Sequence, residues 1–330
     1  MTDLALIADI GGTNARFALT DLAAAHPQLA HIRSLPGAEF ASLQHAAEYY
    51  LGLVDVRPRC AAFAVACPVA GDEIRLTNRA WAFSRRELQS RLGLGQLTVI
   101  NDFGAVAWAV PALGAAERVW LHGPDTASLQ GPVSVLGPGT GLGVGLLVGD
   151  ARRGWQVVET EGGHVSFAPQ GEEEQLIAHW LNARYGRAST ERLLSGEGLA
   201  SIDAALAYHA NPSLTPAAPR EPAVIVAAAL DGHDQIARRA LARFCAILGS
   251  VAGDTALIHG ARTLMIAGGI VPRFIPFLRS SAFRERFLAK GRFAAYLDSV
   301  ALYIVTHPTP GLLGAAVALR AEQQIEDRDR

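Results

Sequence analysis

The amino-acid sequence predicts an α/β protein made of two domains, and three observations support this fold class. First, the chain has 330 residues, which is long for one hydrophobic core, and 50% of them are hydrophobic. Second, short apolar runs alternate with helical patterns through the first third of the chain, as expected for helices packed on a central sheet. Third, a pattern of strand, glycine-rich turn and strand occurs twice, roughly one domain length apart.

Both copies of this pattern place glycines where the chain must turn sharply. The first turn lies in residues 9–16, Asp-Ile-Gly-Gly-Thr-Asn-Ala-Arg, and the second in residues 137–143, Gly-Pro-Gly-Thr-Gly-Leu-Gly. Glycine tolerates positive φ and lets backbone N–H groups close on an anion, so two such hairpins can hold the phosphates of one nucleotide. The pair therefore predicts phosphoryl transfer, although each turn taken alone is also compatible with a purely structural β-turn.

The first hairpin carries side chains suited to phosphate and magnesium. Thr13, Asn14 and Arg16 can donate hydrogen bonds to phosphate oxygens, and Asp9 ends the preceding strand. A carboxylate in that position can bind hydrated Mg²⁺, which prefers carboxylate and water ligands. The motif differs from the P-loop because no Gly-Lys-Ser/Thr follows it. In the second hairpin, Thr140 adds a hydroxyl donor at the turn.

Asn101 and Asp102 follow a buried strand that is predicted at residues 97–100. The carboxyl end of a strand is where α/β sheets bind ligands. An aspartate there can accept the proton of a hydroxyl group that attacks a phosphate. The alternative role of Asp102 is to cap the helix that begins at Phe103, and locally capping is the more frequent role of such a residue.

A carboxylate and an imidazole lie three residues apart in Glu161-Gly-Gly-His164. A metal site would need further ligands at suitable spacing, and none is visible in the sequence. Glutamate, histidine and asparagine side chains can instead bind the hydroxyl groups of a sugar. Glu191 follows Ser189 and Thr190 and by default begins a helix, where its charge complements the helix dipole.

Further helices and strands are predicted from apolar periodicity and from capping and turn residues. The capping-box spacing of Ser84 and Glu87 begins a short helix. The acidic run 172–174 is expected in the first turn of a helix, and residues 284–286 and 290–292 on a solvent-exposed face. The other predicted elements are strands at residues 61–67, 263–266 and 301–305, helices at residues 104–109, 172–185, 235–260 and 312–322, and an exposed proline-rich loop at residues 209–222.

Composition and charge disfavour several classes of function without excluding them. The formal net charge of −2 gives no general attraction for nucleic acid or for an anionic membrane. The first residues lack the pattern of a signal peptide, and the uncharged stretch 131–149 holds too many glycines for a membrane-spanning helix. Cys60, Cys67 and Cys245 have neither a disulfide nor a zinc-binding spacing. We therefore expect a cytoplasmic protein that binds neither nucleic acid nor membrane.

In combination, these motifs resemble the bacterial glucokinase family, within a wider superfamily of sugar kinases, actin and heat-shock chaperones. The resemblance extends over nearly the whole chain, and the order and separation of its motifs are highly specific. The motifs are Asp9-Ile-Gly-Gly-Thr-Asn-Ala-Arg16, Thr77-Asn-Arg-Ala-Trp-Ala-Phe83, Ile100-Asn-Asp-Phe103, Gly139-Thr-Gly-Leu-Gly143, Glu161-Gly-Gly-His164, Glu191-Arg-Leu-Leu-Ser-Gly196, Ala267-Gly-Gly-Ile-Val-Pro272 and Pro310-Gly-Leu-Leu-Gly314.

The resemblance implies a two-domain α/β fold of the ribonuclease-H-like (actin-like ATPase) sugar kinase type, with a central cleft between the domains. A small domain at residues 1–112 would be completed by a C-terminal segment at about residues 304–325, and residues 113–303 would form a larger domain. The resemblance also implies ATP as phosphoryl donor, Mg²⁺ as cofactor, glucose as substrate, and a homodimer.

Roles for individual residues follow from the same resemblance. Asp102 is the expected general base for the 6-hydroxyl group of the sugar, and Asp9 is expected to hold Mg²⁺ through water. The expected glucose-binding residues are Asn101, Asp102, Glu161, His164 and Glu191. The expected ATP-binding residues are Asp9, Gly11, Gly12, Thr13, Asn14, Gly139, Thr140, Gly141, Gly268 and Gly269.

Related repressor-type sugar kinases carry a cysteine-rich zinc motif after the histidine that matches His164, and a helix-turn-helix segment before the kinase region. Here the next cysteine is Cys245 and no such segment precedes, which favours the glucokinase branch. Three alternative functions compete with glucokinase: a kinase of mannose, fructose or N-acetylglucosamine, a non-catalytic sugar sensor, and an actin- or chaperone-like ATPase. Asp102 argues against the sensor, and the predicted sugar-binding residues argue against the ATPase.

Overall fold

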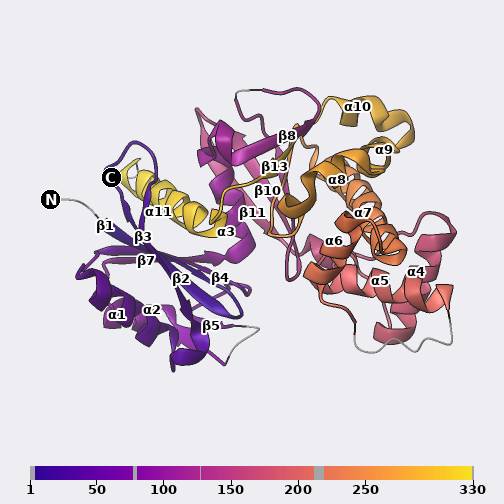
Figure 1. Cartoon of the computed structure of the whole chain (residues 1–330). Helices are drawn as coiled ribbons and strands as arrows, with labels where there is room; N and C mark the ends of the chain where they lie inside the picture. The colour runs from indigo at the N-terminus through magenta and orange to yellow at the C-terminus, as the bar shows by residue number, and fades with distance from the viewer. Residues whose placement is uncertain (1–3, 77–79, 127, 212–218, 329–330) are drawn as a thin grey trace. The chain divides into compact units, whose positions relative to one another are not determined.

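The structure, a computed structural model, describes residues 4–76, 80–126, 128–211 and 219–328. Contacts divide the chain into two compact units. The first comprises Met1–Gly114, Ala151–Glu159 and His307–Arg330, and the second comprises Ala115–Asp150 and Thr160–Thr306. The chain is mixed α/β, as predicted, with sheets and helices throughout (Figure 1).

The first unit is built on a five-stranded sheet with the order β3-β2-β1-β4-β7. β1 pairs antiparallel with β2 and parallel with β4, and β4 pairs parallel with β7. The strands are β1 (Leu4–Ile10), β2 (Asn14–Asp21), β3 (Leu29–Pro36), β4 (Cys60–Val65) and β7 (Gln96–Asn101), and β5 (Glu73–Arg75) and β6 (Ala82–Ser84) form a separate ribbon.

Helices cover both faces of this sheet (Figure 1), and successive residues of its central strands pack against opposite layers. Leu6 and Ala8 of β1 pack in the core formed with α1 (Leu43–Val54) and α2 (Arg85–Arg91). Ala5 and Ile7 of the same strand pack instead with α3 (Asp102–Ala109) and α11 (Pro310–Arg328). Both faces of the sheet are therefore covered, which explains why β1 and β4 are continuous apolar runs.

The helices α3 and α11 pack with their backbones in contact. A Cβ atom added at Gly314 of α11 would overlap the carbonyl oxygen of Ala105 in α3. Glycine is needed at this position because any side chain would force the two helices apart. The contact fixes α3, which begins at Asp102, against a segment that lies more than two hundred residues later in the chain.

The sheet of the second unit has the order β11-β10-β9-β12-β13-β8. β9 pairs antiparallel with β10 and parallel with β12, which pairs parallel with β13. Five strands therefore repeat the connectivity of the first sheet, and β8 is added at the edge. The strands are β8 (Arg118–His122), β9 (Val133–Pro138), β10 (Leu142–Asp150), β11 (Gly154–Thr160), β12 (Thr263–Ile266) and β13 (Ala301–Val305), and most of β11 is grouped with the first unit.

Helix α7 (Gln235–His259) passes through the hydrophobic core of the second unit. In the described part of the chain it is the one helix long and apolar enough to cross a membrane, and 72% of its most apolar window is buried inside the protein. Packing in the core therefore accounts for its apolar character. The other helices of this unit are α4 (Gly171–Tyr185), α5 (Gly196–Ala210), α6 (Pro222–Asp231), α8 (Ile275–Ser280), α9 (Phe283–Leu288) and α10 (Ala294–Asp298).

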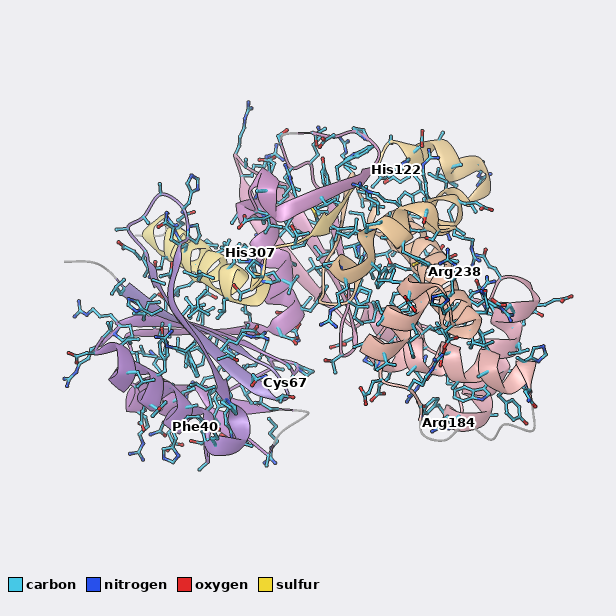
Figure 2. The ribbon with its side chains drawn as sticks, viewed as in Figure 1. Phe40, Cys67, His122, Arg184, Arg238 and His307 are labelled. Atoms are coloured by element: carbon cyan, nitrogen blue, oxygen red, sulfur yellow. The ribbon has the colours of Figure 1, made fainter. Side chains whose placement is uncertain are left out.

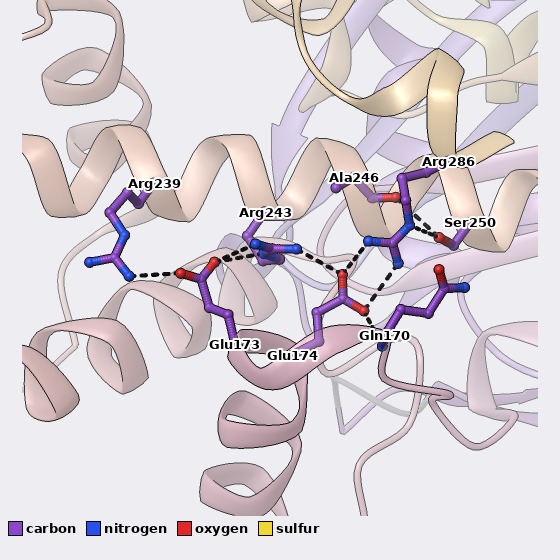
Figure 3. Close-up of polar contacts among 8 residues, drawn as sticks. All are labelled: Gln170, Glu173, Glu174, Arg239, Arg243, Ala246, Ser250 and Arg286. Atoms are coloured by element: carbon purple, nitrogen blue, oxygen red, sulfur yellow. Dashed lines mark hydrogen bonds and ion pairs between the residues drawn. The ribbon is translucent and has the colours of Figure 1, made fainter. Parts of the chain in front are cut away.

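Charged side chains of α4, α7 and α9 form a group that we call the α4–α7–α9 ion cluster: Glu173, Glu174, Arg239, Arg243 and Arg286 (Figure 3). The buried carboxylate of Glu174 accepts hydrogen bonds from Arg286 at 2.7 and 3.1 Å and from Arg243 at 3.1 Å. Glu173 accepts hydrogen bonds from Arg239 and Arg243, each at 2.7 Å. Each carboxylate is thus paired with two guanidinium groups.

Several predicted elements are confirmed with little change in their bounds. β12 and β13 have the predicted bounds, and α4 and α7 each differ from the prediction by one residue at one end. The Ser84 hydroxyl accepts a hydrogen bond from the Glu87 backbone N–H at 3.1 Å, so this cap is also confirmed. Residues 172–174 lie in the first turn of α4, as predicted.

Other predictions were wrong or lie partly outside the described residues. The Arg286 and Lys290 side chains, predicted to be solvent-exposed, are only 13% and 10% exposed, because each pairs with a carboxylate of another helix, Glu174 or Asp254. The predicted loop 209–222 is shorter, since α5 extends through Ala210 and α6 begins at residue 222. Residues 212–218 of that loop and residues 77–79 of the second motif lie outside the described residues.

Candidate active site

In the first unit, Asn101 ends β7 and Asp102 begins α3. Asn101 is the N-cap residue, because its Oδ1 atom accepts hydrogen bonds from the backbone N–H groups of Phe103 at 2.9 Å and Gly104 at 3.1 Å. The alternative in which Asp102 caps the helix was therefore wrong: β7 extends one residue further than predicted, and the capping position moves to Asn101. Asp102 stands in the first turn, where its Oδ1 atom also accepts from the Phe103 N–H at 2.8 Å.

Cys67, which is labelled in Figure 2, lies just after β4. Its backbone carbonyl fixes the other end of the Asn101 side chain. The Asn101 Nδ2 group donates a hydrogen bond to the Cys67 carbonyl oxygen at 3.3 Å. Burial raises the pKa of the Cys67 thiol above its ordinary value, and the negative charge of Asp102 raises it further. Asp102 thus lies near a buried thiol, and its neighbour Asn101 is held by both its side-chain oxygen and its side-chain nitrogen.

Glu159 of β11, which was not among the residues predicted from the sequence, also contacts the start of α3. Its Oε1 atom accepts a hydrogen bond from the Asn101 backbone N–H at 3.1 Å. A signal was available in the sequence: Gly104 occupies the third helical position, where a capping box would carry glutamate or glutamine. A helix without that side chain needs an acceptor from elsewhere for the N–H of its capping residue.

The first glycine hairpin connects β1 to β2. The Gly11 N–H donates to the Asn14 carbonyl at 3.0 Å, and the Gly37 N–H donates to the Thr13 carbonyl at 3.0 Å. Gly12 and Thr13 are exposed at the tip of the turn. Backbone hydrogen bonds therefore hold the turn from behind and leave its tip accessible to a ligand.

Asp9 lies one residue before the end of β1, and its side chain is 18% exposed. Burial raises the pKa of its carboxyl above the ordinary value, and Arg16, whose Nη1 atom lies 3.5 Å from Oδ2, lowers it only in part. Gly311 leaves room beside the carboxylate, because a Cβ atom there would lie 3.0 Å from Oδ2. A partly buried carboxylate that has a guanidinium nitrogen at 3.5 Å and no side chain on the neighbouring Gly311 is compatible with a hydrated Mg²⁺ ion.

The first glycine hairpin and the Asn101–Asp102 pair lie at the same end of the parallel strands of the first sheet. Asp9 pairs with Ala64, and Ala64 pairs with Ile100, the residue before Asn101. The strands β1 and β7 are therefore separated by β4 alone, and at the spacing of neighbouring strands they lie about 10 Å apart. The fold brings the first hairpin and Asp102 to one end of the parallel strands, where α/β sheets bind ligands.

In the second unit, the structure brings together Glu161, His164 and Glu191, which we call the carboxylate–imidazole trio. The His164 Nε2 atom lies 3.8 Å from the Glu161 carboxylate, and its Nδ1 atom lies 3.7 Å from that of Glu191. These side chains are 71%, 56% and 31% exposed for Glu161, His164 and Glu191. The expectation that Glu191 begins a helix was wrong: it lies in a turn, and α5 begins only at Gly196.

The trio lies beside the second glycine hairpin, which connects β9 to β10. The Leu142 backbone N–H donates to the Glu191 Oε2 atom at 3.0 Å. A Cβ atom at Gly141 would lie 2.5 Å from the same oxygen, and one at Gly163 would overlap the Leu142 carbonyl oxygen. Glycines at these positions therefore let the hairpin approach the trio closely. Thr140 is exposed at the turn, as a phosphate ligand would have to be.

The remaining predicted glycines lie around the same hairpin. The Gly196 N–H donates to the Gly139 carbonyl at 2.9 Å, which ties the turn to the start of α5. Gly268 has a φ of +88°, and a Cβ atom there would overlap the Pro138 carbonyl oxygen at the end of β9. Gly268 and the adjacent Gly269 thus follow β12 at the point where it runs beside β9.

No group of three or more His, Cys, Asp or Glu side chains suited to a metal ion occurs among the residues that the structure describes. The predicted role of Asp9 in holding Mg²⁺ through water stays a prediction. The predicted residues are divided between the units. The first holds Asp9, Gly11–Asn14, Asn101 and Asp102, and the second holds Gly139–Gly141, Glu161, His164, Glu191, Gly268 and Gly269.

Comparison with known proteins identifies the family. The family model described as Glucokinase matches residues 6–322. A glucokinase from Psychromonas ingrahamii is 42% identical over 323 residues, covering 97% of this chain and 98% of that protein, and one from Pectobacterium atrosepticum is 43% identical over 321 residues with the same coverage. The crystal structure of a glucokinase from an Antarctic psychrotroph matches with a TM-score of 0.86 at 37% identity, covering 97% of this chain and all of that one. The resemblance inferred from the motifs is confirmed, and the chain belongs to the glucokinase family.

Proposed function

We propose that this protein is an ATP-dependent glucokinase, which transfers the γ-phosphoryl group of ATP to O6 of D-glucose and releases glucose 6-phosphate and ADP. We also propose that the chain has a ribonuclease-H-like sugar kinase fold with a central cleft between two domains. The small domain would comprise residues 1–112 and about 304–325, and the larger domain residues 113–303. Membership of the glucokinase family over residues 6–322 supports the reaction.

Sugar binding is assigned to the trio together with Asn101 and Asp102. The trio offers carboxylate acceptors and an imidazole whose nitrogens lie more than 3.5 Å from those carboxylates, so these groups have capacity for sugar hydroxyls. One hydrogen of the Asn101 amide bonds to Cys67, which leaves the second to donate to the sugar. A site that bonds each hydroxyl discriminates strongly against sugars that leave a polar group unpaired.

Proton transfer is assigned to Asp102. Its position at the first residue of α3 follows a strand end, and Asn101 and Phe103 on either side are held by hydrogen bonds. An ionised carboxylate can accept the proton of the 6-hydroxyl group as the oxygen of that group attacks phosphorus. The proton leaves O6 for Asp102, and the bond between the γ-phosphorus and the bridging oxygen of ADP breaks.

Phosphate binding is assigned to the two glycine hairpins, and adenosine binding to Gly268 and Gly269. The exposed tips at Gly12, Thr13 and Thr140 can approach phosphate oxygens without interference from bulky side chains. Asp9 would hold Mg²⁺ through water, and that ion would neutralise charge on the β- and γ-phosphates. Preorganised donors of this kind stabilise the charge that develops in the transition state.

One observation carries the proposal: the trio is bonded directly to the second glycine hairpin, through Glu191 and the Leu142 N–H. This contact joins side chains suited to a sugar to a turn suited to phosphate. An actin-like or chaperone-like ATPase has no use for such a neighbour of its phosphate loop, whereas a sugar kinase requires one. The observation therefore favours a kinase over a plain ATPase.

The test is ADP production by the purified protein with Mg-ATP, measured without sugar and with glucose, mannose, fructose or N-acetylglucosamine. Strong stimulation by glucose over the other three sugars supports the proposal. A preference for another hexose would show that this hexose, and not glucose, is the substrate. If no hexose stimulated ADP production while glucose still bound in calorimetry, the protein would be a sugar sensor and not a kinase.

Several expectations from the sequence stay predictions. These are the homodimer, the cytoplasmic location, and the lack of nucleic-acid or membrane partners. Sedimentation of the purified protein across a range of concentrations would test the homodimer directly.

A further inference from the structure

The start of α3 is an incomplete capping box. In a capping box, the side chain of the N-cap residue accepts from backbone N–H groups of the first turn, and a glutamate or glutamine at the third helical position accepts from the N-cap N–H. Asn101 fulfils the first half through the N–H groups of Phe103 and Gly104. The second half is absent from the helix itself, because its third residue is Gly104.

Glu159 supplies the absent half from another segment. Its Oε1 atom accepts from the Asn101 backbone N–H at 3.1 Å, the bond that a carboxylate at position 104 would make. It also occupies the space of that side chain: the three atoms nearest to a Cβ built on Gly104 all belong to Glu159, and the closest, Oε1, would be 2.6 Å away. Because Gly104 has no side chain, the carboxylate of Glu159 can approach the first turn of α3.

The hydrogen bond from the Asn101 N–H to Glu159 also gives an acceptor to a backbone group at the edge of the sheet. β7 is an edge strand, paired through β4 alone. The N–H at the end of this strand belongs to the same residue that caps α3, so one carboxylate ends the sheet and starts the helix. Asp102 follows immediately, and its orientation depends on how the backbone passes from strand to helix at Asn101.

We propose that Glu159 is a positioning residue for the base Asp102, acting as a capping-box glutamate supplied by β11 in place of one at position 104. The inference rests on the proposed kinase function, since it concerns the same base. Glu159 lies two residues before Glu161 in the chain and is itself assigned no contact with sugar or nucleotide. Its effect on the reaction runs through the backbone of Asn101 and the placement of the Asp102 carboxylate.

The test compares Glu159→Ala, Glu159→Gln and the double variant Glu159→Ala with Gly104→Glu. Loss of the carboxylate in Glu159→Ala is expected to lower kcat for glucose about tenfold to a hundredfold with less than about a twofold change in KM, because misplacing a catalytic group slows chemistry more than binding. Glu159→Gln keeps an acceptor oxygen and is expected to retain most of kcat. The double variant restores the carboxylate within α3 itself, in the space that Glu159 vacates, and is expected to recover most of the loss. Glu172→Ala, an exposed glutamate in the first turn of α4, is the matched control.

Hydrogen exchange of the Asn101 amide supplies a second readout that needs no activity. Exchange should be about tenfold or more faster in Glu159→Ala and slow again in the double variant, as expected for loss and return of a hydrogen bond to a charged group. A kcat within twofold of wild type in Glu159→Ala would overturn the proposal, as would a loss of kcat that the double variant fails to recover while the amide is again protected. A wild-type protein that phosphorylates no hexose would instead refute the proposed function, and the exchange experiment would still decide whether Glu159 caps α3.

Discussion

The α4–α7–α9 ion cluster and the carboxylate–imidazole trio are both groups of charged side chains in the second unit, yet they are built differently. In the ion cluster, the hydrogen bonds to the carboxylates measure 2.7–3.1 Å, and Glu174 has no exposed surface. In the trio, the charged groups approach one another only to 3.7 and 3.8 Å, and Glu161 and His164 are more than half exposed.

The difference separates charged groups that are bonded to one another within the fold from charged groups that are proposed to bind a ligand. A buried charge without a partner destabilises a protein by several kcal/mol, so the ion cluster must be complete within the chain. The trio is open to solvent and does not satisfy its own hydrogen-bonding capacity, which agrees with its proposed role in binding the hydroxyl groups of a sugar. Substitutions in the cluster should therefore change stability, and substitutions in the predicted site should change activity.

The largest change in kcat is expected for Asp102→Asn, which tests whether a substitution in the predicted site lowers activity. An amide cannot accept the hydroxyl proton as a carboxylate does, so kcat should fall by about a thousandfold or more, while glucose binding is largely retained. Steady-state kinetics and calorimetry with glucose measure the two quantities. Comparable turnover in the variant would remove Asp102 from the role of base.

Glu174→Gln tests the stability side. Removing this charge leaves the largely buried Arg286 without a counter-charge and Arg243 with Glu173 alone, so the free energy of unfolding should fall by about 3 kcal/mol. Urea denaturation followed by circular dichroism measures the loss, with Glu172→Gln on the exposed side of the same helical turn as control. The contrast would fail if this variant unfolded like wild type but lost turnover.

Glu161→Gln should affect binding without affecting stability. A hydrogen bond to a charged group contributes about 1.5–3 kcal/mol, so KM for glucose should rise roughly tenfold to a hundredfold. The urea midpoint should stay at the wild-type value because the Glu161 side chain is 71% exposed. An unchanged KM together with a lowered midpoint would place Glu161 with the structural carboxylates instead.

The smallest effect is a dependence on pH that arises in the ion cluster. Burial alone would raise the pKa of Glu173, but hydrogen bonds and charge from Arg239 and Arg243 lower it below the ordinary value of 4.5. The unfolded chain therefore binds a proton more readily than the folded one, and the stabilisation is present above about pH 4.5 and lost as the pH falls below it. Glu173→Gln should lower stability at pH 7 by about 1 kcal/mol or less and flatten the decline in acid. Thermal unfolding between pH 3 and 7 measures both, and parallel curves for the two proteins would contradict the assignment.

The same comparison shows what could be predicted from the sequence. Local signals were sufficient for the two hairpins, because each combines glycines with flanking apolar runs and the strands pair with their neighbours in the chain. They were insufficient for the ion cluster: Arg286 lies 112 residues after Glu174, and a charged residue on a short helix is more often exposed than paired.

Within the predicted site, the sequence did not show which of two neighbouring residues fills a given structural role. Asn101 and Asp102 are equally good capping residues, so only the end of β7 decides which of them caps α3. Glu191 has the local pattern of a helix start, but its side chain bonds to the Leu142 N–H of a hairpin that lies some fifty residues earlier. Long-range hydrogen bonds of this kind leave no periodic trace in the sequence.

The contact between Gly314 and Ala105 has a consequence for the synthesis of the protein. The helix α3 is made before the second unit, and its partner α11 is made after it. On the ribosome, the second unit has all of its residues when the chain reaches position 306, whereas α3 still lacks the surface that covers it. Because domains fold as units during translation, we expect the second unit to fold first in the nascent chain, and α3 to reach its final packing only when α11 emerges.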